Sequence, residues 1–525
     1  MRQTLVNHFL EHSAGKFPEK VALLCHGQRL TYAELNGRAD ALAAALAGAG
    51  VVRGDRVAVF MDNSVEAVVS IFATMKAGAA FMVVNPTTKA EKLEYILNNS
   101  RARVLVTQTP RRAVASRVSS PHLETVILAG KAGADVAAFA GARLLSFEDA
   151  VAAAPAGGLV SPCIDLDLAG VIYTSGSTGN PKGVMLSHLN MVSAADSITT
   201  YLENTPDDVI VNVLPLAFDY GLYQVLMAFK IGGTVVLERS FTYPYEIIEL
   251  MIREKVTGFP GVPTIFAILL GLKDLPKWDL SSLRYMTNTA AALPASHIRR
   301  LRELFPAVRL YSMYGLTECK RVSYLPPAEL DRRPHSVGRG MPNEEVYIVD
   351  EQGNRVGPGV VGELVVRGAN VMLGYWELPE ETAACIRPGK YPGERVLYTG
   401  DLFKTDEEGF LYFVARKDDI IKSRGEKVSP KEVENALYGL DGVLEAAVIG
   451  VPDDILGEAV KAFVVPEAGA ALTERDVLKH CAAHLENFMV PKAVEIMKSL
   501  PKTSTGKISK KELKSGDFAR HENLH

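Results

Sequence analysis

The alternation of helix and strand patterns over about the first four hundred residues limits the fold more than any other feature of this sequence. DRVAVFM (55–61) predicts a buried strand, SVEAVVSIFATMKAG (64–78) a helix, and AAFMVVNP (79–86) a second strand. A helix pattern at 89–99 and a strand pattern at 103–108 continue the series. Strands that alternate with helices form βαβ units, which align the strands in parallel and cover both sheet faces with helices. We therefore predict an α/β fold of doubly wound, mostly parallel sheets.

The alternation of helix and strand patterns is weak over residues 110–165 and resumes after them. Residues 110–165 are rich in alanine and show little periodicity, so we predict a surface connection there. Strand patterns return near Leu168 and at VIVNVLPL (209–216), GGTVVLE (232–238) and VTGFPGV (256–262). The large N-terminal unit is thus predicted to contain two rounds of βαβ structure.

The type of secondary-structure pattern changes after about residue 335. Short strand patterns separated by DEQG and GPG turns predict a β-rich subdomain over about 335–415. A charged stretch at 416–427 then leads into a mixed segment. A chain of 525 residues is too long for one hydrophobic core. We predict a large domain over 1–417 and a small, mobile α+β domain over 418–525.

Composition narrows the function classes. The chain is 48% hydrophobic and 22% charged, and its net charge of −4 argues against nucleic acid as a partner. Its five cysteines show no CxxC pair or Cys/His cluster, so neither a disulfide framework nor structural zinc is predicted. The N-terminal segment lacks an apolar signal core, and Glu66, Lys76 and Gly78 interrupt the most apolar stretch. We therefore expect no membrane span and a cytoplasmic location.

The stretch YTSGSTGNPKGVMLSH (173–188) lies between an apolar strand pattern and a helix pattern. Its glycines let backbone N–H groups converge, its hydroxyls add donors, and its lysine supplies a mobile positive charge. These groups suit a polyphosphate. The spacing of a Walker P-loop is absent, which argues against a P-loop kinase or ATPase.

Four more motifs follow in the chain. They are Tyr314-Gly-Leu-Thr-Glu318, Tyr398-Thr-Gly-Asp401, Arg416-Lys-Asp-Asp-Ile-Ile-Lys422 with Gly425, and Pro501-Lys-Thr-Ser-Thr-Gly-Lys507. With the glycine-rich stretch, they make the chain resemble the adenylate-forming superfamily over essentially its whole length. It is most similar to stand-alone AMP-forming acyl-CoA synthetases. Peptide-synthetase adenylation domains and oxygen-dependent luciferases share the same motifs.

The resemblance implies a ligase with two half-reactions. A carboxylic acid attacks the α-phosphate of ATP, giving acyl-AMP and pyrophosphate, and a pantetheine thiol then forms a thioester. The approach of two anions requires positive charge and Mg²⁺ at the reacting centre. The expected small molecules are the acid, ATP and CoA, an activity typical of fatty acid metabolism. Phosphopantetheine on a carrier protein is the other candidate acceptor.

The resemblance also assigns residue roles. Thr317 contacts the α-phosphate, and Glu318 binds Mg²⁺. Asp401 accepts hydrogen bonds from the ribose hydroxyls, with Arg416 beside it. Lys507 bridges the acid and the α-phosphate during adenylation. The rest of the expected ATP/AMP site consists of Thr174, Ser175, Gly176, Ser177, Thr178, Gly179, Lys182, Ala290, Ala291, Tyr314 and Gly315.

For the second half-reaction, the resemblance implies a rotation of the C-terminal domain about a hinge at Asp418. The rotation withdraws Lys507 and brings Lys422 into the site as a catalytic residue. Gly425 and Lys427 would then line the pantetheine tunnel.

The expected acid pocket contains Phe218, Asp219, Tyr220, Tyr223, Asn288 and Met313. Asp219 has two interpretations. As in peptide-synthetase domains, it could bind a substrate amine, which implies loading of an amino or imino acid onto a carrier protein. Alternatively, it caps the helix that follows. Residues 326–350 resemble stand-alone acyl-CoA synthetases, which favours an acid without an amine.

Overall fold

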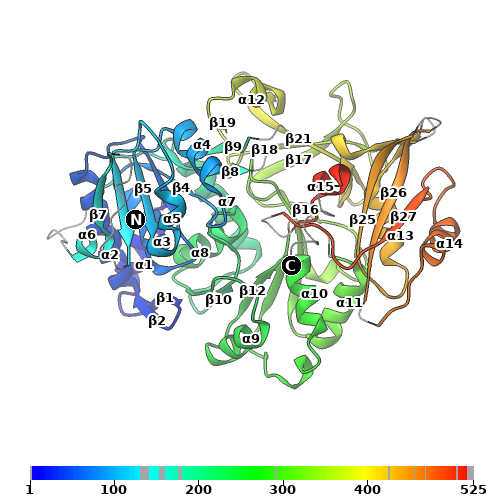
Figure 1. Ribbon diagram of the computed structural model, residues 1–525, viewed down its shortest axis with the longest axis horizontal. Helices are drawn as coiled ribbons and strands as arrows, with labels where there is room; N and C mark the ends of the chain where they lie inside the picture. Colours follow the sequence, from blue (N-terminus) through cyan, green and yellow to red (C-terminus); the bar gives the residue numbers. More distant parts are fainter. Residues whose placement is uncertain are drawn as a thin grey trace.

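A computed structural model describes residues 3–130, 141–152, 160–174, 180–289, 293–423, 426–453, 456–467, 469–503 and 507–516. Four sheets follow one another along the molecule (Figure 1). Two large sheets form the N-terminal part, drawn in blue to green. A smaller antiparallel sheet comes next, and a fourth sheet, in orange, lies at the C-terminal end.

The first large sheet has eight strands in the order β19-β9-β8-β4-β3-β5-β6-β7, and the pairs from β8 to β7 are parallel. The hairpin β8–β9 and the short β19 add antiparallel pairs at one edge. The strands are β3 (Arg56–Phe60), β4 (Ala80–Val83), β5 (Val104–Gln108), β6 (Thr125–Ala129), β7 (Arg143–Ser146), β8 (Leu168–Thr174), β9 (Lys182–Ser187) and β19 (Gly374–Tyr375). The helices associated with them are α3 (Val65–Lys76), α4 (Ala90–Ser100), α5 (Arg112–Ala115) and α6 (Phe147–Ala152).

The prediction of a surface connection at 110–165 is wrong. The segment contains β6, whose five residues are all buried, together with β7, α5 and α6. A parallel strand covered on both faces has no polar alternation, so TVILA carries no period-2 signal. Five residues are also too few to separate a buried strand from other apolar runs.

The second large sheet has nine strands in the order β16-β15-β14-β13-β12-β10-β11-β1-β2. Its six central strands, from β14 to β1, are parallel. The strands are β1 (Val21–Cys25), β2 (Gln28–Thr31), β10 (Val209–Asn212), β11 (Thr234–Leu237), β12 (Gly258–Gly261), β13 (Tyr285–Asn288), β14 (Arg309–Tyr314), β15 (Ser323–Leu325) and β16 (Arg339–Gly340). The helices associated with it are α1 (His8–Lys16), α2 (Tyr32–Gly48), α8 (Asp219–Ile231), α9 (Pro244–Arg253), α10 (Pro263–Gly271) and α11 (Ala295–Leu304). Helix α7 (His188–Tyr201) follows β9 and contacts β8 and β9 of the eight-stranded sheet.

One hydrophobic core joins the two large sheets. Helices α2 and α8 pack on the nine-stranded sheet, α3 and α7 pack on the eight-stranded sheet, and the two pairs meet. Helix α3 is buried along almost its whole length, and its terminal Lys76 pairs with Glu11 at 3.0 Å and Asp40 at 2.7 Å. A buried ammonium is tolerated there because carboxylates neutralise it. The doubly wound prediction is confirmed.

The β-rich subdomain is an antiparallel sheet of five strands, as predicted. It contains β17 (Glu344–Val349), β18 (Gly362–Gly368), β20 (Ile386–Pro388), β21 (Arg395–Thr405) and β22 (Leu411–Arg416), with α12 (Pro379–Cys385) beside it. The C-terminal part contains β23 (Ile421–Ser423), β24 (Glu426–Val428), β25 (Val443–Asp453), β26 (Gly457–Pro466) and β27 (Ala493–Ile496). Its helices are α13 (Pro430–Tyr438), α14 (Glu474–His484) and α15 (Lys510–Ser515). All five cysteines are free thiols, and no helix in the described ranges has the length and apolar character needed to cross a membrane.

The imidazole of His188 fixes the N-terminal segment to the core. It is fully buried at the start of α7, and its Nδ1 accepts a 3.1 Å hydrogen bond from the Val6 N–H. Burial lowers the pKa of His188 to about 4, with the Asp167 carboxylate opposing that shift and His8 adding to it. The ring is therefore neutral in the folded protein at ordinary pH.

We expect this histidine to make the fold acid-sensitive. Because its folded pKa lies below the unfolded value of 6.5, the unfolded state binds the proton first, and stability falls as pH drops from 6.5 towards 4. The full effect is about 3 kcal/mol. His188→Asn keeps an acceptor for Val6 but does not titrate, so its stability should fall less over this range in urea unfolding. Parallel pH profiles for the two proteins would contradict the assignment.

Candidate active site

The described ends of the glycine-rich stretch lie on a β-hairpin. Thr174 at the end of β8 pairs with Lys182 at the start of β9. The Lys182 ammonium lies 5.3 Å from the centre of the Tyr375 ring on β19. A Cβ at Gly183 would lie 2.7 Å from Val171 Cγ1, so only glycine lets the strands pack this closely. Ser175, Gly176, Ser177, Thr178, Gly179, Ala290 and Ala291 lie outside the described residues.

A tight loop after β14 presents Thr317 and Glu318. A Cβ at Gly315 would lie 2.7 Å from the Lys320 carbonyl oxygen and 2.9 Å from Arg321 Cα, so the chain folds back closely on itself. Glycine is needed for this backbone approach. The loop therefore separates Thr317 and Glu318 at its turn from Lys320 and Arg321 on its returning arm.

Glu318 is oriented by a tyrosine from the neighbouring sheet. The Tyr375 hydroxyl donates a 2.7 Å hydrogen bond to Glu318 Oε1, whereas Oε2 accepts none from the part of the chain that the structure describes. Burial and the adjacent carboxylate raise the pKa of Tyr375, so its hydroxyl stays protonated. Mg²⁺ held mainly by phosphate oxygens needs one or two carboxylates. Glu318, with an oxygen available, fits that role.

Asp401 has an unused oxygen in a buried position. The Tyr314 hydroxyl donates a 2.5 Å hydrogen bond to Asp401 Oδ2, and the carboxylate is on a residue only 8% exposed. Oδ1 has no hydrogen-bond partner among the described residues, although Arg416 Nε lies 3.4 Å away. A buried acceptor without a donor is costly. Hydroxyl donors of a ribose would satisfy it.

The electrostatics of Asp401 connect it to the C-terminal part. Burial raises the pKa of Asp401, while the Tyr314 hydrogen bond and the charges of Arg416 and Lys507 oppose that rise; Glu318 adds to it. The Lys507 ammonium is thus close enough to act on this carboxylate. The Thr503 N–H donates a 2.7 Å hydrogen bond to the Lys507 carbonyl oxygen, and the Lys507 N–H donates a 3.2 Å hydrogen bond to Thr503 Oγ1.

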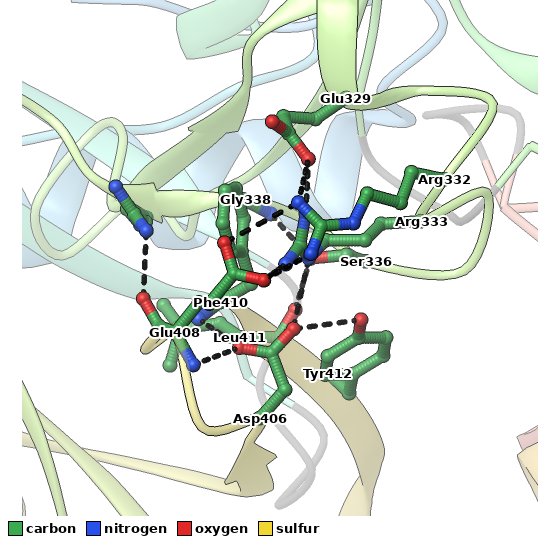
Figure 2. A network of polar contacts seen from close by, with 11 residues as sticks. Glu329, Arg332, Arg333, Ser336, Gly338, Asp406, Glu408, Phe410, Leu411 and Tyr412 are labelled. Carbon is green, nitrogen blue, oxygen red and sulfur yellow. Dashed lines mark hydrogen bonds and ion pairs between the residues drawn. The ribbon is translucent and has the colours of Figure 1, made fainter.

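An ion-pair network anchors the hairpin formed by β21 and β22 (Figure 2). Asp401 and Arg416 are paired across the two strands of this hairpin. Arg333, only 5% exposed, pairs with Asp406 at 2.9 Å and with Glu408 at 2.5 Å at the hairpin turn. Its guanidinium also pairs with Glu329 and lies 3.9 Å from the centre of the Phe410 ring. Such a network holds the hairpin in one position against the preceding loop.

Asp219 is paired within the chain. The Lys320 ammonium donates to the Asp219 backbone oxygen at 3.0 Å and to Oδ2 at 3.2 Å. The interpretation of Asp219 as a helix cap is wrong, because α8 has Phe218 at its N-cap with no side-chain capping bond, and Asp219 is the first helical residue. The acidic side chain turns to the buried lysine instead.

Aromatic rings surround this pair. The Lys320 ammonium lies 4.4 Å from the centre of the Tyr223 ring and 5.5 Å from that of Tyr220. Burial lowers the pKa of Lys320 to about 7, with Asp219 opposing the shift and Arg321 adding to it. The Tyr220 hydroxyl donates a 2.9 Å hydrogen bond to the Thr287 carbonyl oxygen, next to the buried Asn288 on β13. Met313 accepts a hydrogen bond from Tyr201 at 3.1 Å.

The residues expected in the second half-reaction follow Arg416 along the chain. Asp418 is an exposed residue of the 3₁₀ turn Lys417–Asp419 after β22. Lys422 is exposed on β23, and its backbone N–H donates to Glu458 at 2.7 Å. Gly425 and the side chain of Lys427 lie outside the described residues.

Four residues of this region escape sequence analysis: Lys320, Arg321, Arg333 and Tyr375. Lys320 and Arg321 directly follow the Tyr314–Glu318 motif, so two adjacent cations there were an available signal. Tyr375 and Arg333 meet partners 57 and 73 residues away along the chain, a relation that spacing does not reveal.

The geometry matches one known family. The model of AMP-binding enzymes covers residues 10–376, and that of the AMP-binding enzyme C-terminal domain covers residues 432–507. The chain belongs to the AMP-binding enzyme family. Of the site residues described above, Tyr314, Thr317 and Glu318 lie in the first matched region and Lys507 in the second, whereas Asp401 and Arg416 lie between the two.

The chain is similar to curated relatives and to solved structures over nearly its full length. A long-chain-fatty-acid–CoA ligase of Bacillus subtilis (strain 168) is 33% identical over 536 residues, covering 98% of this chain and 94% of the relative. A (7a-methyl-1,5-dioxo-octahydro-1H-inden-4-yl)propanoyl:CoA ligase of Rhodococcus jostii (strain RHA1) is 36% identical over 523 residues, covering 96% and 97%. The crystal structure of the anthranilate CoA ligase AuaEII with anthranoyl-AMP has a TM-score of 0.89 at 29% identity, covering 99% and 98%.

The contact between Tyr375 and Glu318 should set the Mg²⁺ requirement. Loss of a residue that orients a metal ligand typically weakens metal affinity 10- to 100-fold. We expect Tyr375→Phe to raise the Mg²⁺ concentration at half-maximal ATP–pyrophosphate exchange by about 10-fold. Glu318→Gln should raise it further because the charge is lost. Tyr391→Phe, an exposed tyrosine, is the matched control. Unchanged Mg²⁺ titrations in both site variants would remove Glu318 from the metal site.

Proposed function

We propose that this protein activates a carboxylic acid with ATP, releasing pyrophosphate, and transfers the acyl group from acyl-AMP to the thiol of CoA. The observation that carries the proposal is the buried Asp401 carboxylate with one unused oxygen, close to Arg416 and within the electrostatic range of Lys507 and Glu318. A site that combines a diol acceptor, a metal carboxylate and two cations suits a nucleotide bound next to a second anion.

In the adenylation step, each side chain has a distinct task. Asp401 holds the ribose, and Tyr314 fixes the orientation of its carboxylate. Lys507 reduces the repulsion between the acid and the α-phosphate, where Thr317 donates a hydrogen bond. Bound through Glu318, Mg²⁺ supplies positive charge that compensates the phosphate oxygens. The carboxylate oxygen forms a bond to the α-phosphorus, and pyrophosphate leaves.

For the thioester step, we propose a rotation of residues 418–525 relative to 1–417 about Asp418. Asp418 is exposed in the 3₁₀ turn directly after β22, at the boundary between the two parts, where a change of backbone conformation displaces no buried side chain of its own. In the second arrangement, Lys422, Gly425 and Lys427 approach the thiol. We favour CoA over a carrier protein as the acceptor and propose the cytoplasm, where ATP and CoA are available, as the location.

The acid is proposed to lack a free amine. Asp219 already pairs with the Lys320 ammonium, which offsets the negative charge that would attract a substrate ammonium. The alternative of amino or imino acid loading is therefore not favoured. Phe218, Tyr220, Tyr223, Asn288 and Met313 remain the proposed walls of the acid pocket.

A panel of acids tests the proposal. Fatty, aromatic, dicarboxylic and amino acids are each incubated with ATP and Mg²⁺, and pyrophosphate release is measured with and without CoA. We expect release with at least one acid lacking an amine, and conversion to its CoA thioester when CoA is present. Pyrophosphate release confined to amino acids, or none with any acid, would overturn it.

Lys507→Ala should separate the two half-reactions. Removing one preorganised charge from the adenylation transition state typically costs about 10²- to 10³-fold in rate. Since the proposed rotation withdraws Lys507, thioester formation from supplied acyl-AMP and CoA should persist. Lys511→Ala, an exposed lysine on α15, is the control for loss of a nearby charge. Equal losses in both steps would contradict the rotation.

We expect substitutions of Asp219 and Lys320 to have non-additive effects on the free energy of unfolding. Asp219→Ala leaves a buried ammonium without its partner, which typically costs about 3–5 kcal/mol. The double variant Asp219→Ala with Lys320→Met removes both charges and should recover most of that loss in the unfolding midpoint. Additive effects of the single changes would show that the two side chains act independently.

A further inference from the structure

Arg321 is a buried cation for which the described part of the chain supplies no carboxylate partner. The residue is only 2% exposed and is among the largest fully buried side chains of the described chain. Its Nε has no hydrogen-bond partner, and no carboxylate in the described ranges forms an ion pair with its guanidinium. The guanidinium lies 5.3 Å from the centre of the Tyr220 ring. A cation–π contact compensates only part of the loss of hydration of a buried charge.

The nearby acidic groups are engaged elsewhere. Asp219 forms its ion pair with Lys320 at 3.2 Å. Glu344 reaches the same region through Asn370, whose amide donates to Glu344 Oε2 at 2.9 Å and to the Arg321 backbone oxygen at 3.3 Å. Burial raises the pKa of Glu344 well above its usual range and so disfavours the charged form of this carboxyl group. Because Asp219 is paired with Lys320, the Arg321 guanidinium is the charge of this cluster that has no ion-pair partner among the described residues.

The position of Arg321 relates this surplus charge to the proposed reaction. Arg321 follows Thr317 by four residues, which limits the separation of their Cα atoms to about 14 Å. The loop folds back at Gly315, and the Arg321 side chain packs against Tyr220, a proposed wall of the acid pocket. A group at the far end of a short or medium acid could reach the guanidinium while its reacting carboxylate lies near Thr317.

We propose that the acid activated by this protein carries a second anionic group, as in a dicarboxylic acid, and that Arg321 binds that group. The inference rests on the proposed acid activation and adds the substrate class. A guanidinium is suited to it because its planar donors bind a carboxylate through two parallel hydrogen bonds. A bound distal carboxylate would supply the missing counter-ion, whereas a plain hydrocarbon chain would leave the arginine unpaired.

The test compares acids of equal length with and without the second carboxylate. Succinate is paired with butyrate, adipate with hexanoate, suberate with octanoate, and terephthalate with benzoate. Steady-state kcat/KM is measured by pyrophosphate release for the wild type, Arg321→Met and Arg321→Lys. We expect a dicarboxylate to be preferred by the wild type. Hydrogen bonds to charged groups predict that Arg321→Met lowers the dicarboxylate-to-monocarboxylate ratio by about 10- to 100-fold. Arg321→Lys should restore part of it.

A second measurement keeps the protein unchanged. The monomethyl ester of the preferred dicarboxylate retains its size but loses the distal charge, so its KM with the wild type should rise by about 10-fold or more. This comparison of the diacid with its ester tests the inference even if Arg321→Met fails to fold. The ligand-induced increase in Tm should likewise be smaller for the ester than for the dicarboxylate.

Two results would overturn the inference and leave the proposed function standing. One is activity with monocarboxylic acids that equals or exceeds that with every dicarboxylate. The other is equal KM for the diacid and its monoester. Absence of pyrophosphate release with all acids would instead refute the proposed function itself, so the two failures are distinguishable.

Discussion

The buried Asp401 carboxylate is the group on which the arrangement of the surrounding side chains depends. A carboxylate removed from water must be hydrogen-bonded or paired, and Asp401 receives one hydrogen bond, from Tyr314, and has Arg416 3.4 Å from its other oxygen. These partners come from β14 and β22, and Lys507 adds charge from the C-terminal part. Asp401 Oδ1 has no hydrogen-bond partner among the described residues, and we propose that a nucleotide ribose supplies one.

The loop after β14 carries two groups of side chains. Gly315 permits the tight return, with Thr317 and Glu318 at the turn and Lys320 and Arg321 on the returning arm. We propose that the first pair faces the nucleotide and the second pair faces the acid. Tyr375 contacts Glu318, and the Arg333 network holds the β21–β22 hairpin. Lys320 pairs with Asp219 within the chain, whereas Arg321 has no ion-pair partner among the described residues. Substrate selection is therefore expected to depend on charge as well as on size.

Sequence analysis predicted the doubly wound sheets and the β-rich subdomain because periodicity reports burial along a single element. It failed at β6, where a strand buried on both faces has no alternation. The motifs indicated Asp401, Glu318 and Lys507, since their spacing is local. Contacts between distant segments, such as Tyr375 with Glu318, depend on the tertiary fold and leave no local pattern. For Asp219, the sequence suggested a cap or an amine, and its lysine partner, 101 residues later, became evident only in the structure.

The most direct test of acid activation is the fate of an oxygen label. An acid that supports pyrophosphate release is prepared with ¹⁸O in its carboxylate and converted by the protein with ATP and CoA. If the carboxylate attacks the α-phosphate, thiolysis of the acyl-AMP leaves one labelled oxygen in AMP, which mass spectrometry detects. AMP without label, or label found in pyrophosphate or inorganic phosphate, would contradict an acyl-AMP intermediate.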